Sequence, residues 1–315
     1  MKAARFGLMA MLAWCLVSAG ADVYVGRIVA TIDPTLLCFG IFMCAVVFFA
    51  LWNFKNRRSL YAKVRTHLTT LVMINITTFI AWYFTIYPLK YIEPSIVVAV
   101  ILATLPIATL LSGVWIGSDK AVATRRNMAV CVLLFLGIGF LAMIVFTHRS
   151  AMQHAAFWPT VLSFVACIVS GVALGVNNIH TKQLSRSGFT PIDILTTRFI
   201  FTVLLTGLIA RHQIPTVIHH YVWLYIVIAG LTMVIIPQTI FQYALRAIEP
   251  LTTSVIGSLK AVVVFGLEFF NQELVLTAWT IIGVVYLTGV ALSGTVLQNR
   301  KKVASPQAEE SSSKV

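Results

Sequence analysis

Charged side chains inside strongly apolar stretches are the first feature of this sequence that could do chemistry. Lys260 lies near the middle of the apolar stretch 250–270, where a lysine costs roughly 2.5–3.5 kcal/mol on membrane-insertion scales. An ammonium group in a confined cavity of low dielectric attracts a carboxylate or phosphate strongly, so we expect Lys260 to contact an anionic ligand. Two alternatives remain open: an ion pair with Glu268, two turns further along, or snorkelling of the lysine to the membrane interface.

Arg198 and Glu268 are the other charged residues that the sequence places well inside apolar stretches. Arg198 lies about two turns from the start of the stretch 191–210. It could reach the interface or lock its helix against backbone carbonyls of a neighbour, and we expect a structural role. Glu268 could be the partner of Lys260 or a group that carries a proton, and the sequence does not separate these two roles.

Polar, aromatic and small residues at helical spacing complete a candidate ligand site. Thr253 lies seven residues before Lys260 on the same helical face, with Gly257 between them. Amides and hydroxyls in lipid need partners, so each polar stripe should face protein or a water-filled cavity, and interhelical hydrogen bonding is the alternative for any one of them. The predicted substrate-binding residues are Lys260, Thr253, Gly257, Asn75, Thr78, Trp82, Gln238, Gln242, Asn177 and Trp14.

The composition requires that these residues be positioned by membrane-spanning helices. Apolar residues make up 59% of the 315 residues, charged residues only 10%, and the mean hydropathy is +0.92, whereas soluble domains carry about 25% charged residues. A spanning helix needs about 20 mostly apolar residues. Ten stretches meet this requirement, which predicts an all-α integral membrane protein with helices at about 5–24, 34–52, 67–87, 94–116, 128–146, 157–179, 191–210, 221–245, 250–270 and 275–297.

The net charge of +13 reflects membrane topology and does not indicate a nucleic-acid partner. If the N-terminus is inside, 17 of the 23 Lys and Arg residues lie in inner segments, four lie in outer loops, and Arg198 and Lys260 lie within spans. Such a bias follows the positive-inside rule. We therefore expect both termini in the cytoplasm.

An internal duplication relates the two halves of the chain. The octapeptide YPLKYIEP at 87–94 recurs as YALRAIEP at 243–250, with five identical positions. Five helices in each half would make the second copy enter the membrane from the opposite side, as in the inverted repeats of secondary transporters. We predict repeats at 1–150 and 151–300, followed by a disordered polar cytoplasmic tail at 301–315.

Each octapeptide is predicted to close one helix and open the next in a tight hairpin. Glu93 and Glu249 precede Pro94 and Pro250, and a carboxylate and a proline both suit the first turn of a helix. We expect this motif to mark the fold and not to touch a ligand. Gly113 with Gly117, and Gly171 with Gly175, are expected to allow close helix packing and not to mark a dimer face.

Metal, cofactor and enzyme chemistry have little support in the sequence. The five cysteines all fall inside predicted spans without a Cys-x-x-Cys pattern, and His219 and His220 lack further ligands at useful spacing. There is no phosphate-binding Gly-x-x-x-x-Gly-Lys-Ser/Thr motif and no nucleophile–base constellation. We expect no cofactor, no metal and no catalytic activity.

The N-terminal stretch resembles a signal peptide, with Lys2 and Arg5, an apolar run and an Ala-x-Ala pattern at 19–21. However, CLVS at 15–18 is echoed by CIVS at 167–170 in the second half. A segment with a counterpart in the other repeat is expected to be a retained helix.

The chain from about Phe6 to Leu297 resembles the drug/metabolite transporter superfamily, with two EamA-type repeats. The resemblance rests on the two octapeptides, on Pro106 and Asp119 with a counterpart at Glu273, and on IIGVVYLTGVALSG at 281–294. The stretch SVIGSLKAVVVFGLEFF around Lys260 is similar to the triose-phosphate and nucleotide-sugar branch, in which a second cation follows the lysine. Here Ala261 follows, so two-point phosphate binding is in doubt.

The resemblance implies a secondary transporter that works by alternating access, and Lys260 predicts that its cargo is a small polar, anionic metabolite. The scarcity of buried carboxylates favours exchange over proton symport. The alternative is an EamA-type exporter of amino acids or drugs in which Lys260 is structural. The expected partners are the substrate and the lipid bilayer, with no nucleic acid, and the chain would be a monomer or homodimer. Short loops fit a bacterial inner membrane.

Overall fold

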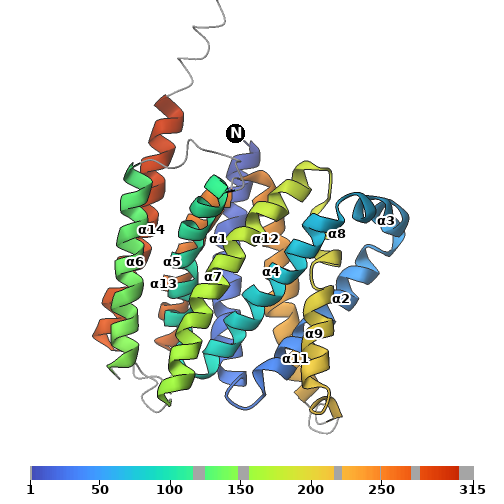
Figure 1. Ribbon diagram of the computed structural model, residues 1–315, viewed down its shortest axis with the longest axis horizontal. Coiled ribbons are helices and arrows are strands. Elements are labelled where there is room, and N and C mark those ends of the chain that lie inside the picture. The colour runs from blue at the N-terminus through green and yellow to red at the C-terminus, as the bar shows by residue number, and fades with distance from the viewer. Residues whose placement is uncertain are drawn as a thin grey trace, which may run out of the picture.

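The computed structural model describes residues 2–115, 125–147, 156–215, 222–248, 250–270 and 277–304. Helices dominate this part of the chain, and it contains no β-strand. Figure 1 shows them as a bundle of roughly aligned rods. The helices are α1 (Lys2–Ile28), α2 (Pro34–Trp52), η1 (Phe54–Asn56), α3 (Arg57–Thr66), α4 (Leu68–Ile86), η2 (Tyr87–Lys90), α5 (Pro94–Trp115), α6 (Arg125–Phe146), α7 (Phe157–Arg186), α8 (Pro191–Thr197), α9 (Ile200–Ala210), α11 (Val222–Ala229), η4 (Gly230–Ile235), α12 (Ile236–Ala247), α13 (Pro250–Glu268) and α14 (Ala278–Ala304).

Helical structure occupies each of the ten apolar stretches predicted from the sequence. Within the described residues, seven helices are long and apolar enough to cross a membrane, and two shorter apolar helices accompany them. The seven are Arg5–Ile28, Pro34–Trp52, Leu68–Lys90, Met128–Phe146, Phe157–Arg186, Pro191–Ala210 and Val222–Ala247. The chain is therefore a multi-pass membrane protein, while a ten-helix inverted repeat stays a prediction.

Several helix boundaries differ from the prediction. The first helix continues four residues beyond 24, to Ile28, so Asp22 lies well inside it. The basic segment after α2 forms a separate helix, α3, which is polar and was expected to be a loop. The stretch 191–210 is divided into α8 and α9 at Arg198 and Phe199. Hydropathy finds apolar runs, but it does not register polar helices at the bundle end or breaks within a run.

The last helix also extends further than predicted. Residues 301–304 belong to α14, so these four positions of the predicted tail are helical. The remaining tail, 305–315, lies outside the described residues, as do Asp119, Glu249, Glu273 and the histidine pair 219–220.

Local capping explains where several helices begin. Asp33 accepts hydrogen bonds from the backbone nitrogens of Thr35 (2.8 Å) and Leu36 (3.3 Å), and Pro34 occupies the first position of α2. Thr190 and Asp193 form a reciprocal capping box at the start of α8. Both arrangements satisfy donors that a helix leaves unpaired in its first turn.

The first octapeptide forms the predicted junction between two helices. Tyr87–Lys90 is a 3-10 turn that follows α4, and α5 begins at Pro94. Glu93 is fully buried beside this helix start. The second octapeptide also separates two helices, because α12 ends at Ala247 and α13 begins at Pro250. The prediction that the motif marks a helix junction is confirmed.

Glycines allow α7 to lie close against α5. A Cβ at Gly171 would lie 2.6 Å from the carbonyl oxygen of Ile101, and one at Gly175 would lie 2.8 Å from the Cβ of Ala108. These are backbone-to-backbone approaches that a larger residue could not make. The expectation that Gly171 and Gly175 serve helix packing is confirmed, whereas Gly117 lies outside the described residues.

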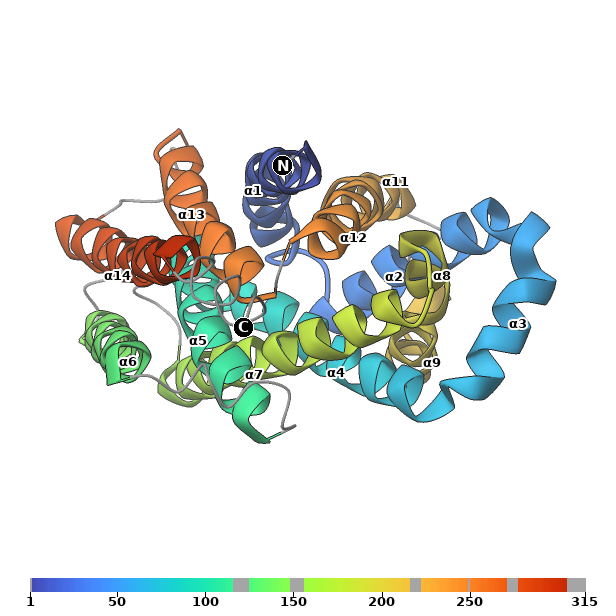
Figure 2. The same cartoon turned by 90° about the horizontal axis from the view of Figure 1, so that it is seen from above.

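The bundle has two edges and a common centre. Seen from above, α6 and α14 lie at one edge, α2 and α3 lie at the other, and α1, α4 and α7 lie between them (Figure 2). The N-terminus, the basic helix α3 and the C-terminal end of α14 gather at one end of the bundle (Figure 1).

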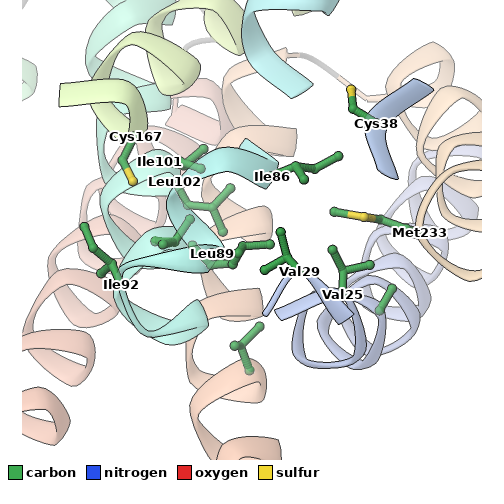
Figure 3. Close-up of a cluster of buried hydrophobic side chains, with 14 of the residues drawn as sticks. Val25, Val29, Cys38, Ile86, Leu89, Ile92, Ile101, Leu102, Cys167 and Met233 are labelled. Carbon is green, nitrogen blue, oxygen red and sulfur yellow. The ribbon is translucent and has the colours of Figure 1, made fainter. Parts of the chain in front are cut away.

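The hydrophobic core at the centre draws side chains from both halves of the chain. Figure 3 shows Val25, Ile86, Leu89, Leu102, Cys167 and Met233 converging there.

Candidate functional site

A cavity of about 70 Å³ lies between helices of the bundle. It is lined by side chains from both halves of the chain, and the lining combines aromatic rings, amides and charges in an otherwise apolar wall. The lining residues are Trp14, Asp22, Trp82, Thr85, Val98, Ile101, Leu102, Leu105, Leu174, Asn178, Arg198, Gln238, Phe241 and Lys260. At roughly 10–15 Å³ for each water, the space corresponds to about five water molecules or a small organic ligand.

Lys260 on α13 forms an ion pair with Asp22 on α1. Its Nζ lies 2.6 Å from Oδ2 of Asp22, and the two side chains are only 12% and 3% exposed. The ammonium also lies 5.1 Å from the ring centre of Trp14, a cation–π distance. The pairing of Lys260 with Glu268 that the sequence left open does not form, and snorkelling does not occur. Lys260 instead pairs with Asp22 of the first helix.

Glu268 instead binds the start of α5. Its Oε1 accepts a hydrogen bond of 2.9 Å from the backbone nitrogen of Ser95, and Glu268 and Ser95 are both fully buried. A carboxylate is stabilised there by the positive end of the helix and by a donor that the helix itself leaves unused. The acid at the end of α13 thus fastens α13 to α5, which places Lys260 in a fixed position.

Arg198 lies at the break between α8 and α9 and is 2% exposed. Its Nη2 donates to Oδ1 of Asn177 at 2.7 Å, and its Nε donates to Oγ1 of Thr78 at 3.4 Å. Nη1 has no hydrogen-bond partner among the described residues. The sequence predicted a structural role through backbone carbonyls. The observed partners are side chains, and Arg198 also lines the cavity.

Asn177 holds Arg198 in place from α7. Its Nδ2, which carries two hydrogens, lies within hydrogen-bond distance of the carbonyl oxygen of Ile74 (3.1 Å) and of the hydroxyls of Thr77 and Thr78 (2.9 Å each). These three acceptors on α4 fix the amide so that its oxygen faces the guanidinium. The network binds α4, α7 and the α8–α9 break together around one buried cation.

Four of the ten predicted site residues line the cavity: Trp14, Trp82, Gln238 and Lys260. Trp82 and Gln238 occupy matching positions of the two repeats, and they meet at the same cavity. Thr78 and Asn177 lie behind the cavity as supports of Arg198.

The other four predicted residues do not line the cavity. Gly257 leaves room for Trp14, because a Cβ there would lie 3.5 Å from the indole ring. Thr253 and Gln242 are buried on the helices that carry Lys260 and Gln238. Asn75 bonds the backbone of Leu71, Thr197 and Phe201 at the α8–α9 break, so its amide is used in structure.

Sequence reasoning missed Asp22 as a site residue and assigned Arg198 to structure alone. Asp22 lies two residues before the predicted end of the first helix, at 24, whereas the observed helix continues to Ile28. A carboxylate on the same apolar helix as Trp14 was the available signal. Asn178, Thr85 and Phe241 also line the cavity, and their positions follow from helix rotation, which a single sequence does not give.

Metal binding finds no support in the described part of the chain, which contains no group of three or more His, Cys, Asp or Glu residues able to hold an ion. The described cysteines are all free thiols.

Comparison with known proteins identifies the family. A model of the EamA-like transporter family matches residues 5–143 and again 161–295. The chain belongs to the EamA-like transporter family. The double match supports two EamA repeats within the drug/metabolite transporter superfamily. Membership indicates a multi-pass membrane transporter.

Other comparisons add fold information only. A solved structure titled "Crystal structure of protein" matches with a TM-score of 0.65 and 16% sequence identity, covering 95% of this chain and 98% of the other. At this identity the likeness shows a shared fold. A search of curated proteins found no match. The similarity of the segment around Lys260 to the triose-phosphate and nucleotide-sugar branch stays a prediction.

Proposed function

We propose that this protein is a secondary transporter that moves a small polar anion across a membrane by alternating access between its two five-helix repeats, as an exchanger. The observation that carries the proposal is the buried cavity between helices of both halves, which two cations line. A charged residue in a membrane interior is costly unless it serves a ligand or a partner. Arg198 has no carboxylate partner among the described residues, so an anionic ligand would supply the missing charge.

The cavity is also built for a polar solute in its other features. Asn178 and Gln238 offer amide donors and acceptors, and Trp14, Trp82 and Phe241 offer rings for the apolar part of a ligand. Sites for small molecules combine an apolar wall with a few convergent polar groups in this way. An EamA-type exporter of amino acids or drugs is the second candidate, favoured by the ion pair of Lys260 with Asp22, which gives Lys260 a structural partner.

The proposed orientation places both termini in the cytoplasm. Basic segments at the N-terminus, in α3 and at the end of α14 share one end of the bundle (Figure 1), as the positive-inside rule requires of the cytoplasmic side. Short connections and this charge bias fit a bacterial inner membrane. The packing of α1 against α12 and α13 in the bundle supports its retention as a helix.

Counterflow into proteoliposomes tests the proposed function. Vesicles containing the full chain are loaded with unlabelled compound, and uptake of the same labelled compound is measured for lactate, malate, 3-phosphoglycerate, alanine and a cationic dye. Saturable counterflow of an anion, absent from protein-free vesicles, is the expected result. Counterflow restricted to alanine or to the dye would overturn the anionic proposal and favour the exporter.

A further inference from the structure

The charges of the residues that line the cavity do not balance, and one positive charge is in excess. Asp22, Arg198 and Lys260 are the Asp, Glu, Lys and Arg residues among its described lining. Lys260 and Asp22 compensate each other at 2.6 Å. Glu268 and Glu93 are buried as well, but neither lines the cavity. Among the charged residues that do line it, one positive charge, that of Arg198, is left without a carboxylate counterpart.

Arg198 is also presented in a fixed orientation. Nε and Nη2 are held by Thr78 and Asn177, and the amide nitrogen of Asn177 is itself held by acceptors on α4. Nη1 is buried and has no partner among the described residues. A buried polar nitrogen left without a partner is costly, and the planar guanidinium matches the geometry of a carboxylate.

We propose that the cavity binds a small monocarboxylate whose carboxylate group is anchored by Arg198, while Asp22 restricts the site to a single negative charge by neutralising Lys260. This inference rests on the proposed function and names the substrate class of that same site. A phosphate monoester carries about −1.5 to −2 charges at neutral pH and exceeds the single available positive charge. A dicarboxylate exceeds it for the same reason.

The size and lining of the cavity support the same ligand class. A volume of about 70 Å³ favours a compound of a few heavy atoms over one as large as a nucleotide sugar. The amides of Asn178 and Gln238 can bond a second carboxylate oxygen or a hydroxyl group, and Trp14, Trp82 and Phe241 can cover an apolar remainder. Lactate, glycerate and benzoate are test compounds with one carboxylate, and malate is lactate extended by a second carboxylate.

Binding to the detergent-solubilised full chain tests the inference without requiring transport. Titration calorimetry would measure the affinities for lactate, glycerate, benzoate, malate and inorganic phosphate. The wild type is expected to bind at least one of the three monocarboxylates more tightly than malate or phosphate. Arg198→Lys should weaken that binding about tenfold or more, because it removes a charged, geometrically matched hydrogen bond. Arg57→Lys, at an exposed arginine beside Phe54, is the matched control and should leave the affinity unchanged.

Asp22→Asn provides a second, independent test. It leaves Lys260 charged and raises the uncompensated charge at the cavity to two, so the preference should move from the monocarboxylate toward malate by about tenfold. Asp33→Asn is the matched control, because Asp33 caps α2 outside the cavity and asparagine caps a helix equally well. Thermal unfolding of each variant would establish that it remains folded.

Different outcomes overturn different statements. Tighter binding of malate or phosphate than of every monocarboxylate by the wild type would overturn the inference, as would unchanged affinity in folded Arg198→Lys. Absence of binding by all three monocarboxylates would also overturn it. Binding of a monocarboxylate without counterflow would overturn the proposed function and leave the binding site in place. Counterflow of malate that is insensitive to Arg198 would overturn the inference alone.

Discussion

Two ion pairs in this protein join the same types of residue in different surroundings. At the end of the bundle, Lys63 of α3 lies 3.0 Å from Asp193 of α8, and the lysine side chain is 31% exposed. In the interior, Lys260 lies 2.6 Å from Asp22 with both side chains buried. The distances are similar, whereas the dielectric around the charges differs greatly. The comparison indicates that the burial of a Lys–Asp pair, more than its distance, determines its effect on stability and on the local charge.

The pair at the bundle end serves local structure. Asp193 also accepts a hydrogen bond from Asn53 and belongs to the capping box of α8, and Lys63 donates to the carbonyl oxygen of Gly188. These contacts connect the segment after α2 to the turn before α8. The lysine side chain is partly exposed, so water screens its charge. Asp193 has further partners in Asn53 and Thr190, and these do not depend on Lys63.

The interior pair sets the charge of the cavity. Two unpaired charges in a membrane interior would each carry a large desolvation cost, and pairing removes most of it. The pair also determines that Arg198 is the one positive charge left uncompensated there. The proposed charge selectivity of the transporter therefore follows from a contact between α1 and α13.

Replacing the lysine of each ion pair should produce the largest difference in stability between the two sites. Lys260→Met leaves Asp22 buried without its partner, which is expected to destabilise the protein by about 3–5 kcal/mol. Lys63→Met should cost at most about 1 kcal/mol because its pair is partly exposed. Thermal and denaturant unfolding in one detergent would measure both. Equal losses in the two variants would contradict the distinction.

The combined variant Asp22→Asn with Lys260→Met sharpens the interior half of the comparison. It removes both charges, so no unpaired charge stays buried, and most of the stability lost in Lys260→Met should return. Unfolding of the two single variants and the double variant gives the coupling energy, which we expect to reach about 2 kcal/mol. Additive losses would show that the two residues do not interact in the membrane protein.

Asn177→Ala tests the support of Arg198, with an intermediate effect. The change removes the acceptor of Nη2 and should cost about 1–3 kcal/mol, because a buried guanidinium loses a charged hydrogen bond. It should also weaken anion binding, since Arg198 is no longer held in orientation. Asn75→Ala removes an amide of the same size that bonds only backbone. It should reduce stability without a separate loss of anion affinity in calorimetry.

Salt dependence gives the smallest expected effect. Raising the ionic strength from about 0.01 to 1 M shortens the screening length from roughly 30 to 3 Å. The small contribution of Lys63 to stability should then fall further, whereas the contribution of Lys260 should change little because its pair is only 12% and 3% exposed. Unfolding of wild type and both lysine variants at the two salt concentrations measures this. A loss of the Lys260 contribution at high salt would show that the interior pair is hydrated.

The sequence predicted those parts of this site that depend on one helix. Lys260 stood out because it is a lone cation in an apolar stretch, and Trp82 and Gln238 were found through the helical spacing of polar and aromatic residues. The partner of Lys260, Asp22, could not be predicted. It lies on a helix more than 200 residues away in the sequence, near the predicted end of that helix. Arg198 was recognised as buried, but its side-chain partners on α4 and α7 depend on the tertiary arrangement.

Helical stripes gave mixed results for the same physical reason. Asn75 and Thr78 share a face in the sequence, yet Asn75 bonds the backbone of the α8–α9 break while Thr78 supports Arg198. Ser170 forms an interhelical bond to the carbonyl oxygen of Ala81. Spacing shows which residues share a face, but it does not show what lies opposite that face. The helix ends were well predicted where proline and capping residues mark them, as at Pro34 and Pro94.

Counterflow of lactate in two variants tests most directly whether Arg198, and not Lys260, holds the anion. The double variant Asp22→Asn with Lys260→Met removes Lys260 while it leaves one uncompensated positive charge at the cavity, and Arg198→Lys alters only the proposed anchor. Saturable lactate counterflow that persists in the folded double variant and is lost in folded Arg198→Lys is the predicted result. Counterflow that persists in Arg198→Lys and is lost in the double variant would contradict it and assign the anion to Lys260.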